Sequence, residues 1–177
     1  MKVALIGRNE ARLGGVPYGD PSWSLWGLAW DPMWRDRLDV LFDPHWPVLA
    51  KSSAEYIAEI DRPVYLDETM VTDKFPTAQA YPLKEVISEI FHGRTPYLES
   101  SVGYMFALAI LKGATTIGLY GISMNGTGEY AHQRPNMEYL IGFAHGRGIN
   151  VIQDNTQRRP ALLLSEWEAG RYGRINP

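Results

Sequence analysis

The sequence predicts an α/β domain with a mostly parallel sheet, and two observations carry this prediction. Short apolar runs that end at glycine or proline alternate along the chain with longer segments in which apolar residues recur at helical spacing. The short runs are apolar throughout, which is typical of strands that are covered on both faces. Strands that alternate with helices favour a parallel sheet flanked by helices.

Six short runs are predicted as strands. The first is closed by Gly7 and the third by Pro44, residues that favour a turn over a continued strand. A segment rich in glycine and proline, 8–21, follows the first strand and is predicted as a loop of functional length. The predicted strands are Val3–Ile6, Trp23–Trp30, Asp39–Asp43, Pro63–Leu66, Thr115–Gly121 and Ile149–Ile152.

Four helices are predicted from apolar spacing and capping residues. In the second, apolar side chains recur at i, i+3, i+4, i+7 and i+8. The third is capped by Ser100, apolar on nearly all sides and closed by Gly113, so we expect it to be buried. The fourth is expected to begin at Pro135, because proline favours the first position of a helix. The predicted helices are 52–60, which opens with a capping-box pattern at Ser52 and Glu55, 83–91, 100–112 and 135–146.

Composition is that of an ordinary globular domain. The chain has 177 residues, 45% of them hydrophobic and 21% charged, and a chain of this length buries a sizeable core without metals or disulfides. We expect one domain, 1–156, followed by an extension, 157–177. Since there is no cysteine, disulfides, thiolate zinc sites and cysteine nucleophiles are excluded. The sequence has neither a signal-peptide pattern nor an apolar run of membrane-spanning length, so we expect a cytoplasmic protein.

The charge balance limits the classes of partner. With 17 Lys and Arg against 20 Asp and Glu the formal net charge is −3, which argues against bulk attraction to nucleic acid or to an anionic membrane. The arginine-rich extension and the surplus of aromatic residues make a homo-oligomer a possible assembly.

In an open parallel sheet, ligands bind beyond the carboxyl ends of the strands, which directs attention to the loops that follow them. The loop after the first strand contains Gly7, Arg8 and Asn9. Glycine lets a backbone approach a phosphate, and arginine supplies the opposite charge. The alternative is a loop whose glycine serves only to turn the chain. Neither GxGxxG nor GxxxxGK[ST] occurs, so dinucleotide and Walker-type sites are only weakly indicated.

Two further pairs of residues follow or precede predicted elements. Ser100 and Ser101 open the third helix, where their hydroxyl and N–H groups would suit a carboxylate, a phosphate or a ribose; the alternative is a simple cap. Asp43 and His45 follow the third strand and are crevice candidates. Two such ligands do not make a metal site, so we expect no bound metal.

The segment 129–134 has the densest group of polar side chains near a predicted helix start. His132 is the candidate general base, with Glu129 orienting its ring and Arg134 balancing phosphate charge. The alternative is an exposed loop histidine without a role.

Tryptophan is concentrated in one part of the chain. Five of the six tryptophans lie between residues 23 and 46. Most are expected to pack the sheet, whereas one or two at a strand end would stack on a base or a sugar ring. Trp30, at the end of the second predicted strand, is the crevice candidate.

The centre of the chain resembles a known family. Residues 99–110 read ESSVGYMFALAI and are followed by Gly113 and by TIGLYGISM at 116–124. This segment resembles the central part of the small bacterial sialyltransferases, in which a serine-initiated Tyr-Met helix, a glycine and a strand ending in Gly-Ile-Asp help to build a site for a cytidine nucleotide sugar. It is also similar to a related domain of unknown function shared by flagellin-glycosylation proteins and a pterin pyrophosphokinase. Ser123 stands where the sialyltransferases have the aspartate.

Short motifs outside this segment are similar to a group of uncharacterised tailed-phage proteins. These motifs are Trp26-Gly27, Tyr120–Met124, Glu129-Tyr130, Gln133-Arg134-Pro135 and Glu138–Gly142.

The resemblance implies a Rossmann-like three-layer fold, with a mostly parallel sheet flanked by helices, that binds a nucleotide or nucleotide sugar. It makes His132 the nearest equivalent of the base that deprotonates an acceptor hydroxyl. The residues that it assigns to phosphate, nucleotide or donor contacts are Gly7, Asn9, Ser100, Ser101 and Gly121.

We therefore expect an enzyme that binds a nucleotide or nucleotide sugar and transfers or hydrolyses a glycosyl or phosphoryl group, with no certain cofactor besides that ligand. It would act in the host cytoplasm if it is phage-encoded. One alternative is a non-catalytic protein that sequesters or senses a nucleotide. Another is a phage structural or assembly protein whose tryptophan-rich surface is an interface.

Overall fold

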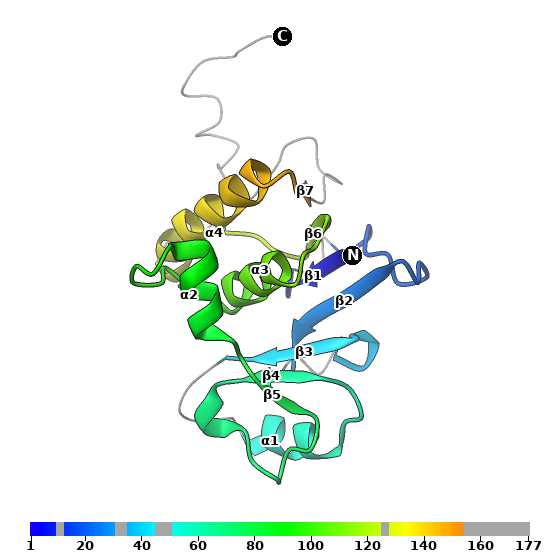
Figure 1. Ribbon diagram of the computed structural model, residues 1–177. Helices are drawn as coiled ribbons and strands as arrows, with labels where there is room; N and C mark the ends of the chain where they lie inside the picture. Colours follow the sequence, from blue (N-terminus) through cyan, green and yellow to red (C-terminus); the bar gives the residue numbers. More distant parts are fainter. Residues whose placement is uncertain (10–12, 31–34, 45–50, 125–127, 154–177) are drawn as a thin grey trace.

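The structure, a computed structural model, describes residues 1–9, 13–30, 35–44, 51–124 and 128–153. Its strands form one seven-stranded sheet in the order β5-β4-β3-β2-β1-β6-β7, and every neighbouring pair is parallel (Figure 1). Helices flank the sheet, so the predicted Rossmann-like three-layer α/β arrangement is confirmed. The strands are β1 Lys2–Ile6, β2 Trp23–Leu28, β3 Val40–Asp43, β4 Val64–Leu66, β5 Ala78–Ala80, β6 Thr116–Tyr120 and β7 Asn150–Gln153.

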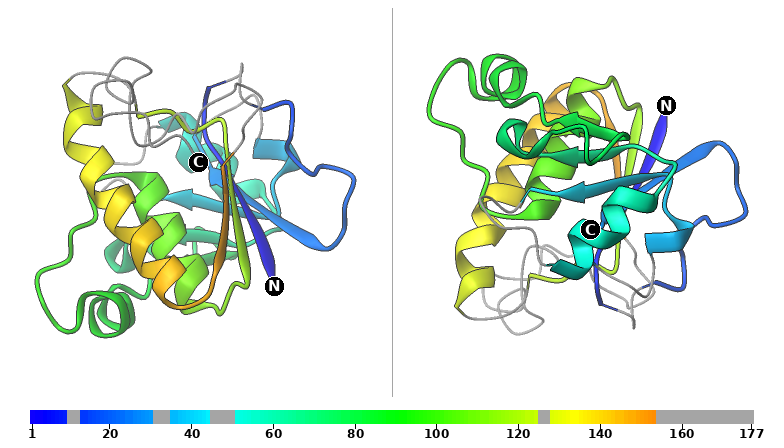
Figure 2. Two further views of the ribbon diagram at one scale, coloured as in Figure 1. Left: turned by 90° about the horizontal axis from the view of Figure 1, so that it is seen from above. Right: turned by 90° about the horizontal axis from the view of Figure 1, so that it is seen from below.

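The helices divide unequally between the two faces of the sheet. The α-helices are α1 Lys51–Glu59, α2 Leu83–Phe91, α3 Ser101–Leu111 and α4 Glu129–Gly146, and two short 3-10 helices are η2 Arg35–Arg37 and η3 Glu68–Met70. Buried side chains of α2, α3 and α4 join one core cluster, whereas those of α1 belong to the cluster on the other face. Figure 2 shows α1 and α4 on opposite sides of the sheet.

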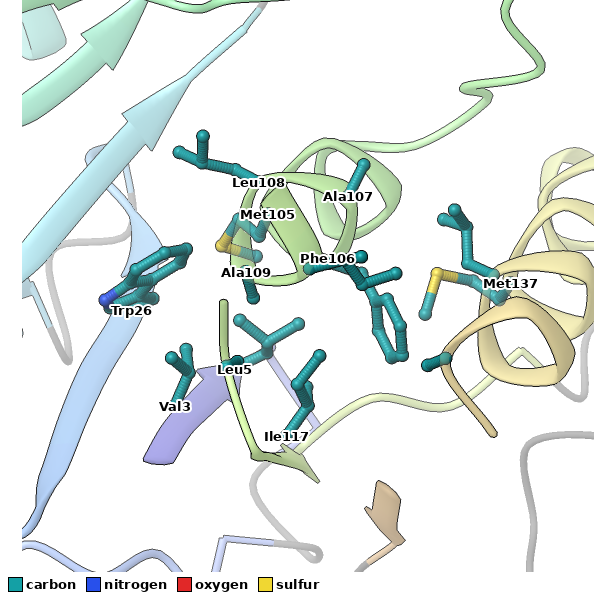
Figure 3. Close-up of a cluster of buried hydrophobic side chains, with 14 of the residues drawn as sticks. Val3, Leu5, Trp26, Met105, Phe106, Ala107, Leu108, Ala109, Ile117 and Met137 are labelled. Atoms are coloured by element: carbon teal, nitrogen blue, oxygen red, sulfur yellow. The ribbon is translucent and has the colours of Figure 1, made fainter. Parts of the chain in front are cut away.

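Helix α3 lies at the centre of the larger core, between the sheet and α4 (Figure 3). Every residue from Met105 to Ile110 is buried, which explains why this helix is apolar on nearly all sides. Phe106 is fully buried and points from α3 toward Ile117 of β6 and Met137 of α4. Ser100 begins the helix as its N-cap, and Gly113 follows it with a φ of 75°, as the sequence predicts.

The opposite face of the sheet is packed by α1 and by aromatic side chains. Ile57 of α1 is fully buried and belongs to the same cluster as Leu41 and Val64 of the sheet. The rings of Trp23 and Tyr120 meet edge to face with their centroids 6.4 Å apart. Trp26 is buried on the α3 side, so these two tryptophans pack the sheet as expected.

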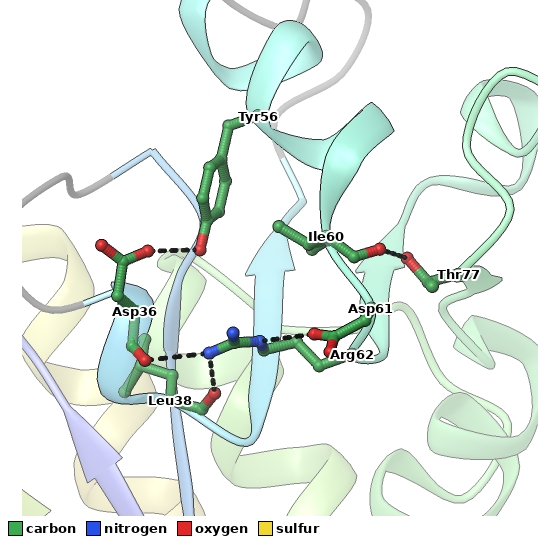
Figure 4. Close-up of polar contacts among 7 residues, drawn as sticks. All are labelled: Asp36, Leu38, Tyr56, Ile60, Asp61, Arg62 and Thr77. Atoms are coloured by element: carbon green, nitrogen blue, oxygen red, sulfur yellow. Dashed lines mark hydrogen bonds and ion pairs between the residues drawn. The ribbon is translucent and has the colours of Figure 1, made fainter.

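Polar contacts fix the amino ends of the strands (Figure 4). The Arg62 guanidinium, just before β4, donates to the carbonyl oxygens of Asp36 and Leu38 at 3.0 and 3.1 Å. The Tyr56 hydroxyl of α1 donates to the Asp36 carboxylate at 2.9 Å. These bonds hold η2 and α1 against the starts of β3 and β4. They lie at the edge of the sheet opposite to the carboxyl ends of the strands.

The prediction that the last helix begins at Pro135 is wrong. Helix α4 begins at Glu129 and contains Pro135 in its interior. Contacts with other elements hold the earlier residues: the Tyr97 hydroxyl donates to the His132 carbonyl at 3.4 Å, and the side chain of Gln133 is buried. The segment 129–134, which includes His132, therefore lies on a helix and not in the predicted loop.

Smaller differences concern three other elements. Strand β5, Ala78–Ala80, was not predicted, because its half-exposed alanines and glutamine lack the β-branched or aromatic residues that favour strands. Strand β2 ends at Leu28, so Trp30 follows the strand. Helix α1 already includes Lys51, and Ser52 is therefore not its N-cap.

Some sequence predictions fall outside the described residues. These are the extension 157–177, His45, Trp34 and Trp46. Within the ranges that are described, no helix combines the length and the apolar character needed to cross a membrane.

Candidate ligand-binding site

The strand order places a topological switch point between β1 and β6. From β1 the chain moves outward through β2, β3, β4 and β5, and it then returns to the other side of β1 to form β6 and β7. Ligands of open α/β sheets bind in the crevice at this point, beyond the carboxyl ends of the strands. A cavity of about 780 Å³ lies there, which is within the range of small-molecule sites.

Loops after four strands and the starts of two helices line the cavity. The loops supply Gly7, Arg8 and Asn9 after β1, Trp30 after β2, Pro44 after β3, and Gly121, Ile122, Ser123 and Met124 after β6; the helices supply Ser100, Ser101, Val102 and Tyr104 from α3 and Tyr130 and Gln133 from α4.

Backbone atoms of the β1 and β6 loops meet at one side of the cavity. The Gly7 N–H donates to the Tyr120 carbonyl and the Asn9 N–H to the Gly121 carbonyl, both at 2.8 Å. Gly121 has a φ of 64°, and a Cβ on Gly7 would lie 2.6 Å from the Gly121 oxygen. Both positions therefore require glycine, and the cavity meets main chain here instead of side chains.

The N-terminus of α3 also opens on the cavity. The Ser100 hydroxyl accepts a hydrogen bond from the Gly103 N–H at 3.0 Å. The N–H groups of Ser101 and Val102 precede the first intrahelical bond, and no residue in the described part of the chain accepts from them. They lie at the positive end of the helix dipole, so this wall favours a bound anion.

Arg8 adds a positive charge to the same cavity. Its guanidinium carbon lies 4.6 Å from the centre of the Trp30 ring, a cation–π geometry that orients the side chain. Among the described residues that line the cavity, the charged ones are Arg8 and Glu99.

Tyr104 of α3 supplies a neutral hydroxyl among the residues that line the cavity. Burial raises the pKa of Tyr104, and the nearby carboxylates of Asp67 and Glu99 raise this pKa further. The Tyr81 hydroxyl donates to the Tyr104 carbonyl at 3.0 Å and holds this turn of α3. Tyr104 therefore keeps its proton at neutral pH and offers a hydrogen-bond donor.

Most of the proposed phosphate and nucleotide residues come together in this structure, although they come from four separate segments. The predicted site residues that line the cavity are Gly7, Arg8, Asn9, Trp30, Ser100, Ser101 and Gly121.

Three of the other predicted residues, His132, Arg134 and Asp43, are described and do not line the cavity. His132 is exposed on α4, and Arg134 pairs with Glu138 at 3.0 Å one turn along the same helix. Asp43 is buried at the end of β3, whereas its neighbour Pro44 lines the cavity. The side chain of Glu129 lies outside the described residues.

Sequence reasoning missed lining residues from the two helices. Tyr104 was assigned to the core with the rest of α3, although it lies one turn after Ser100 and Ser101. Tyr130 and Gln133 were missed as a pair because the start of α4 was misplaced. Residues that are three apart in a helix share a face. A correctly placed start of α4 would therefore have indicated that Tyr130 and Gln133 lie together.

The described residues contain no group of three or more histidine, aspartate or glutamate side chains that could hold a metal ion. The polar side chains that line the cavity are hydroxyls, amides, the Arg8 guanidinium and the Glu99 carboxylate.

The Ser100 cap makes a measurable contribution to stability. Replacing Ser100 by alanine should lower the free energy of unfolding by about 1 kcal/mol, because the Gly103 N–H loses its acceptor. Urea denaturation of Ser101→Ala provides the control: its hydroxyl has no partner among the described residues, so a change below about 0.5 kcal/mol is expected. Equal losses in the two variants would contradict the capping role.

Comparisons of this chain with protein-family models, curated proteins and solved structures find no match. The resemblance of residues 99–124 to the small bacterial sialyltransferases thus stays a prediction from the sequence.

Proposed function

We propose that this protein binds a nucleoside phosphate or a nucleotide sugar in the cavity between the carboxyl ends of β1 and β6. The observation that carries the proposal is the meeting of two anion-binding features at the switch point. These are the N-terminus of α3 and the side chain of Arg8, which lie in one cavity with the closely approaching main chain of Gly7 and Gly121.

The other lining groups suit the rest of such a ligand. Trp30 offers an aromatic face near the Arg8 guanidinium, and aromatic faces stack on bases and sugar rings. Tyr104 and Gln133 add polar groups that suit sugar hydroxyls or base edges. Phosphate contacts alone would not discriminate among nucleotides, so we assign specificity to these side chains.

Calorimetry and thermal-shift measurements with nucleoside mono- and diphosphates and nucleotide sugars test the proposal. We expect saturable binding and a raised melting temperature for at least one ligand. Arg8→Ala should weaken that binding by roughly 10- to 100-fold, the value of a hydrogen bond to a charged group. Lys112→Ala removes an equal charge at the far end of α3 and should leave affinity unchanged. Absence of binding across the panel would refute the proposal.

Glycosyl or phosphoryl transfer is the reaction that the sequence resemblance favours, with His132 as the base. The position of His132 favours a second candidate, nucleotide binding without turnover, because this side chain is exposed and does not line the cavity. His132→Ala separates them when ligand consumption is followed by chromatography. Retained binding with lost turnover supports transfer, whereas retained binding and no turnover in either protein supports the second candidate.

A further inference from the structure

A fully buried amide connects α4 to the segment that directly precedes α3. Asn136 of α4 has 0% exposure. Its Nδ2 donates to the Tyr97 carbonyl, and its Oδ1 accepts from the Glu99 N–H at 3.5 Å. The amide orientation follows from these partners, because a carbonyl requires a donor and an N–H requires an acceptor.

The two bonds bracket Leu98 in the way that a neighbouring parallel strand would. A parallel partner bonds the carbonyl before a residue and the N–H after it, and Asn136 bonds the carbonyl of Tyr97 and the N–H of Glu99. The Asn136 side chain thus makes the two hydrogen bonds that a residue of a neighbouring strand would make, and it holds residues 97–99 against α4. The Tyr97 hydroxyl adds a third contact, to the His132 carbonyl.

Gly103 makes room for this arrangement. A Cβ on Gly103 would lie 2.4 Å from the Asn136 Oδ1, so any side chain at position 103 would displace the amide. Gly103 and Asn136 are therefore complementary, and the Gly103 N–H also carries the Ser100 cap.

The segment held by Asn136 forms part of the cavity wall. Leu98, Glu99 and Ser100 line the cavity, and α3 begins directly after them. Tyr130 and Gln133 line the cavity from α4, the helix that carries Asn136. The Asn136 amide and the Tyr97 hydroxyl make hydrogen bonds that bridge these two walls.

We propose that Asn136 is a positioning residue, which sets the place of the α3 N-terminus relative to α4 and thereby the geometry of the anion-binding wall. An apolar side chain would fill the same buried space without the cost of desolvating an amide. The bonds to residues 97 and 99 give the polar group its role. The effect on affinity rests on the proposed nucleotide site, whereas the effect on the segment does not.

Hydrogen exchange of the ligand-free protein tests the positioning role directly. In Asn136→Ala the hydrogen-bonded amides of Glu99, Gly103 and Tyr104 should exchange at least about tenfold faster, while those of β1 and β6 keep their protection. Leu140→Ala, at a fully buried site on the same helix, is the matched control. It should destabilise the protein globally without a selective effect on these three amides.

Asn136→Asp provides a pH profile that a purely space-filling role would not produce. The ionised carboxylate offers no donor to the Tyr97 carbonyl, whereas the protonated acid supplies both an O–H donor and a carbonyl acceptor. Burial favours the neutral acid, so the protection of the Glu99, Gly103 and Tyr104 amides, corrected for intrinsic exchange, should recover as the pH falls from about 8 to about 5. Asn136→Ala should show no such recovery.

Calorimetry with inorganic pyrophosphate tests whether Asn136 also affects anion binding at the proposed site. Affinity should fall roughly tenfold in Asn136→Ala and stay within about twofold of the parent in Leu140→Ala. Unchanged exchange at Glu99, Gly103 and Tyr104 in Asn136→Ala, or a flat profile in Asn136→Asp, would overturn the positioning role. Selective loss of protection together with no pyrophosphate or nucleotide binding by the parent protein would uphold the positioning role and refute the proposed function.

Discussion

Replacing Gly121 by alanine should lower the free energy of unfolding by about 2–5 kcal/mol and should close part of the cavity. The backbone of Gly121 has a φ of 64°, which costs other residues about 1–2 kcal/mol. The added Cβ would also lie 2.6 Å from the Leu13 Cδ2 and 2.8 Å from the Gly7 oxygen, and such overpacking costs about 1–3 kcal/mol more. Urea denaturation measures the loss.

Two other glycines separate the causes of that loss. Gly113 has a φ of 75° but open space around its Cβ position, so Gly113→Ala should show the backbone strain alone, about 1–2 kcal/mol. Gly142 lies inside α4 with neither strain nor neighbours, and Gly142→Ala should stabilise the protein by about 0.5–1 kcal/mol. Equal losses at Gly121 and Gly113 would contradict the close approach of the β1 and β6 loops.

Phe106→Ala should have the largest effect on stability, a loss of about 3–5 kcal/mol. Its ring is among the largest fully buried side chains and fills the space between α3, β6 and α4 (Figure 3). Because domains are stable by only about 5–15 kcal/mol, this loss would remove a large share of the free energy of unfolding. Calorimetry or urea denaturation measures this change.

Phe143→Ala is the control for the loss of an aromatic ring. Phe143 is only partly buried on α4, beside His92 and Arg147. Its removal should cost about 1–2 kcal/mol, since less apolar surface is returned to water. Similar losses at the two positions would show that the centre of the core does not lie around Phe106.

The sequence predicts those elements in which local signals agree. Helix α3 combines a serine cap, a continuous apolar stretch and a closing glycine, and the structure places these features as expected. Helix α2 has a clear apolar stripe, with Val86, Ile90 and Phe91 buried. Such signals need no knowledge of the rest of the chain.

Other parts depend on contacts that no local pattern contains. The start of α4 is held by Tyr97 and Gln133, and a proline in its interior points to a later start. Strand β5 forms because it pairs with β4, despite a weak strand composition. The rule for parallel sheets directs attention to the loops of the cavity, but the lining residues of α4 require the helix to be placed first.

The pairing of β1 with β6 has a consequence for how the protein folds. Met1 and Thr115, which adjoin these strands and bond to each other, are 114 residues apart. Closing so long a loop costs entropy before the pairing compensates for it, and such non-local contacts slow folding. A nascent chain that has emerged only as far as β5 contains Gly7 and Arg8 but lacks α3, β6 and Gly121. The cavity is therefore completed late, and binding of the proposed ligand during synthesis would report that β6 has paired with β1.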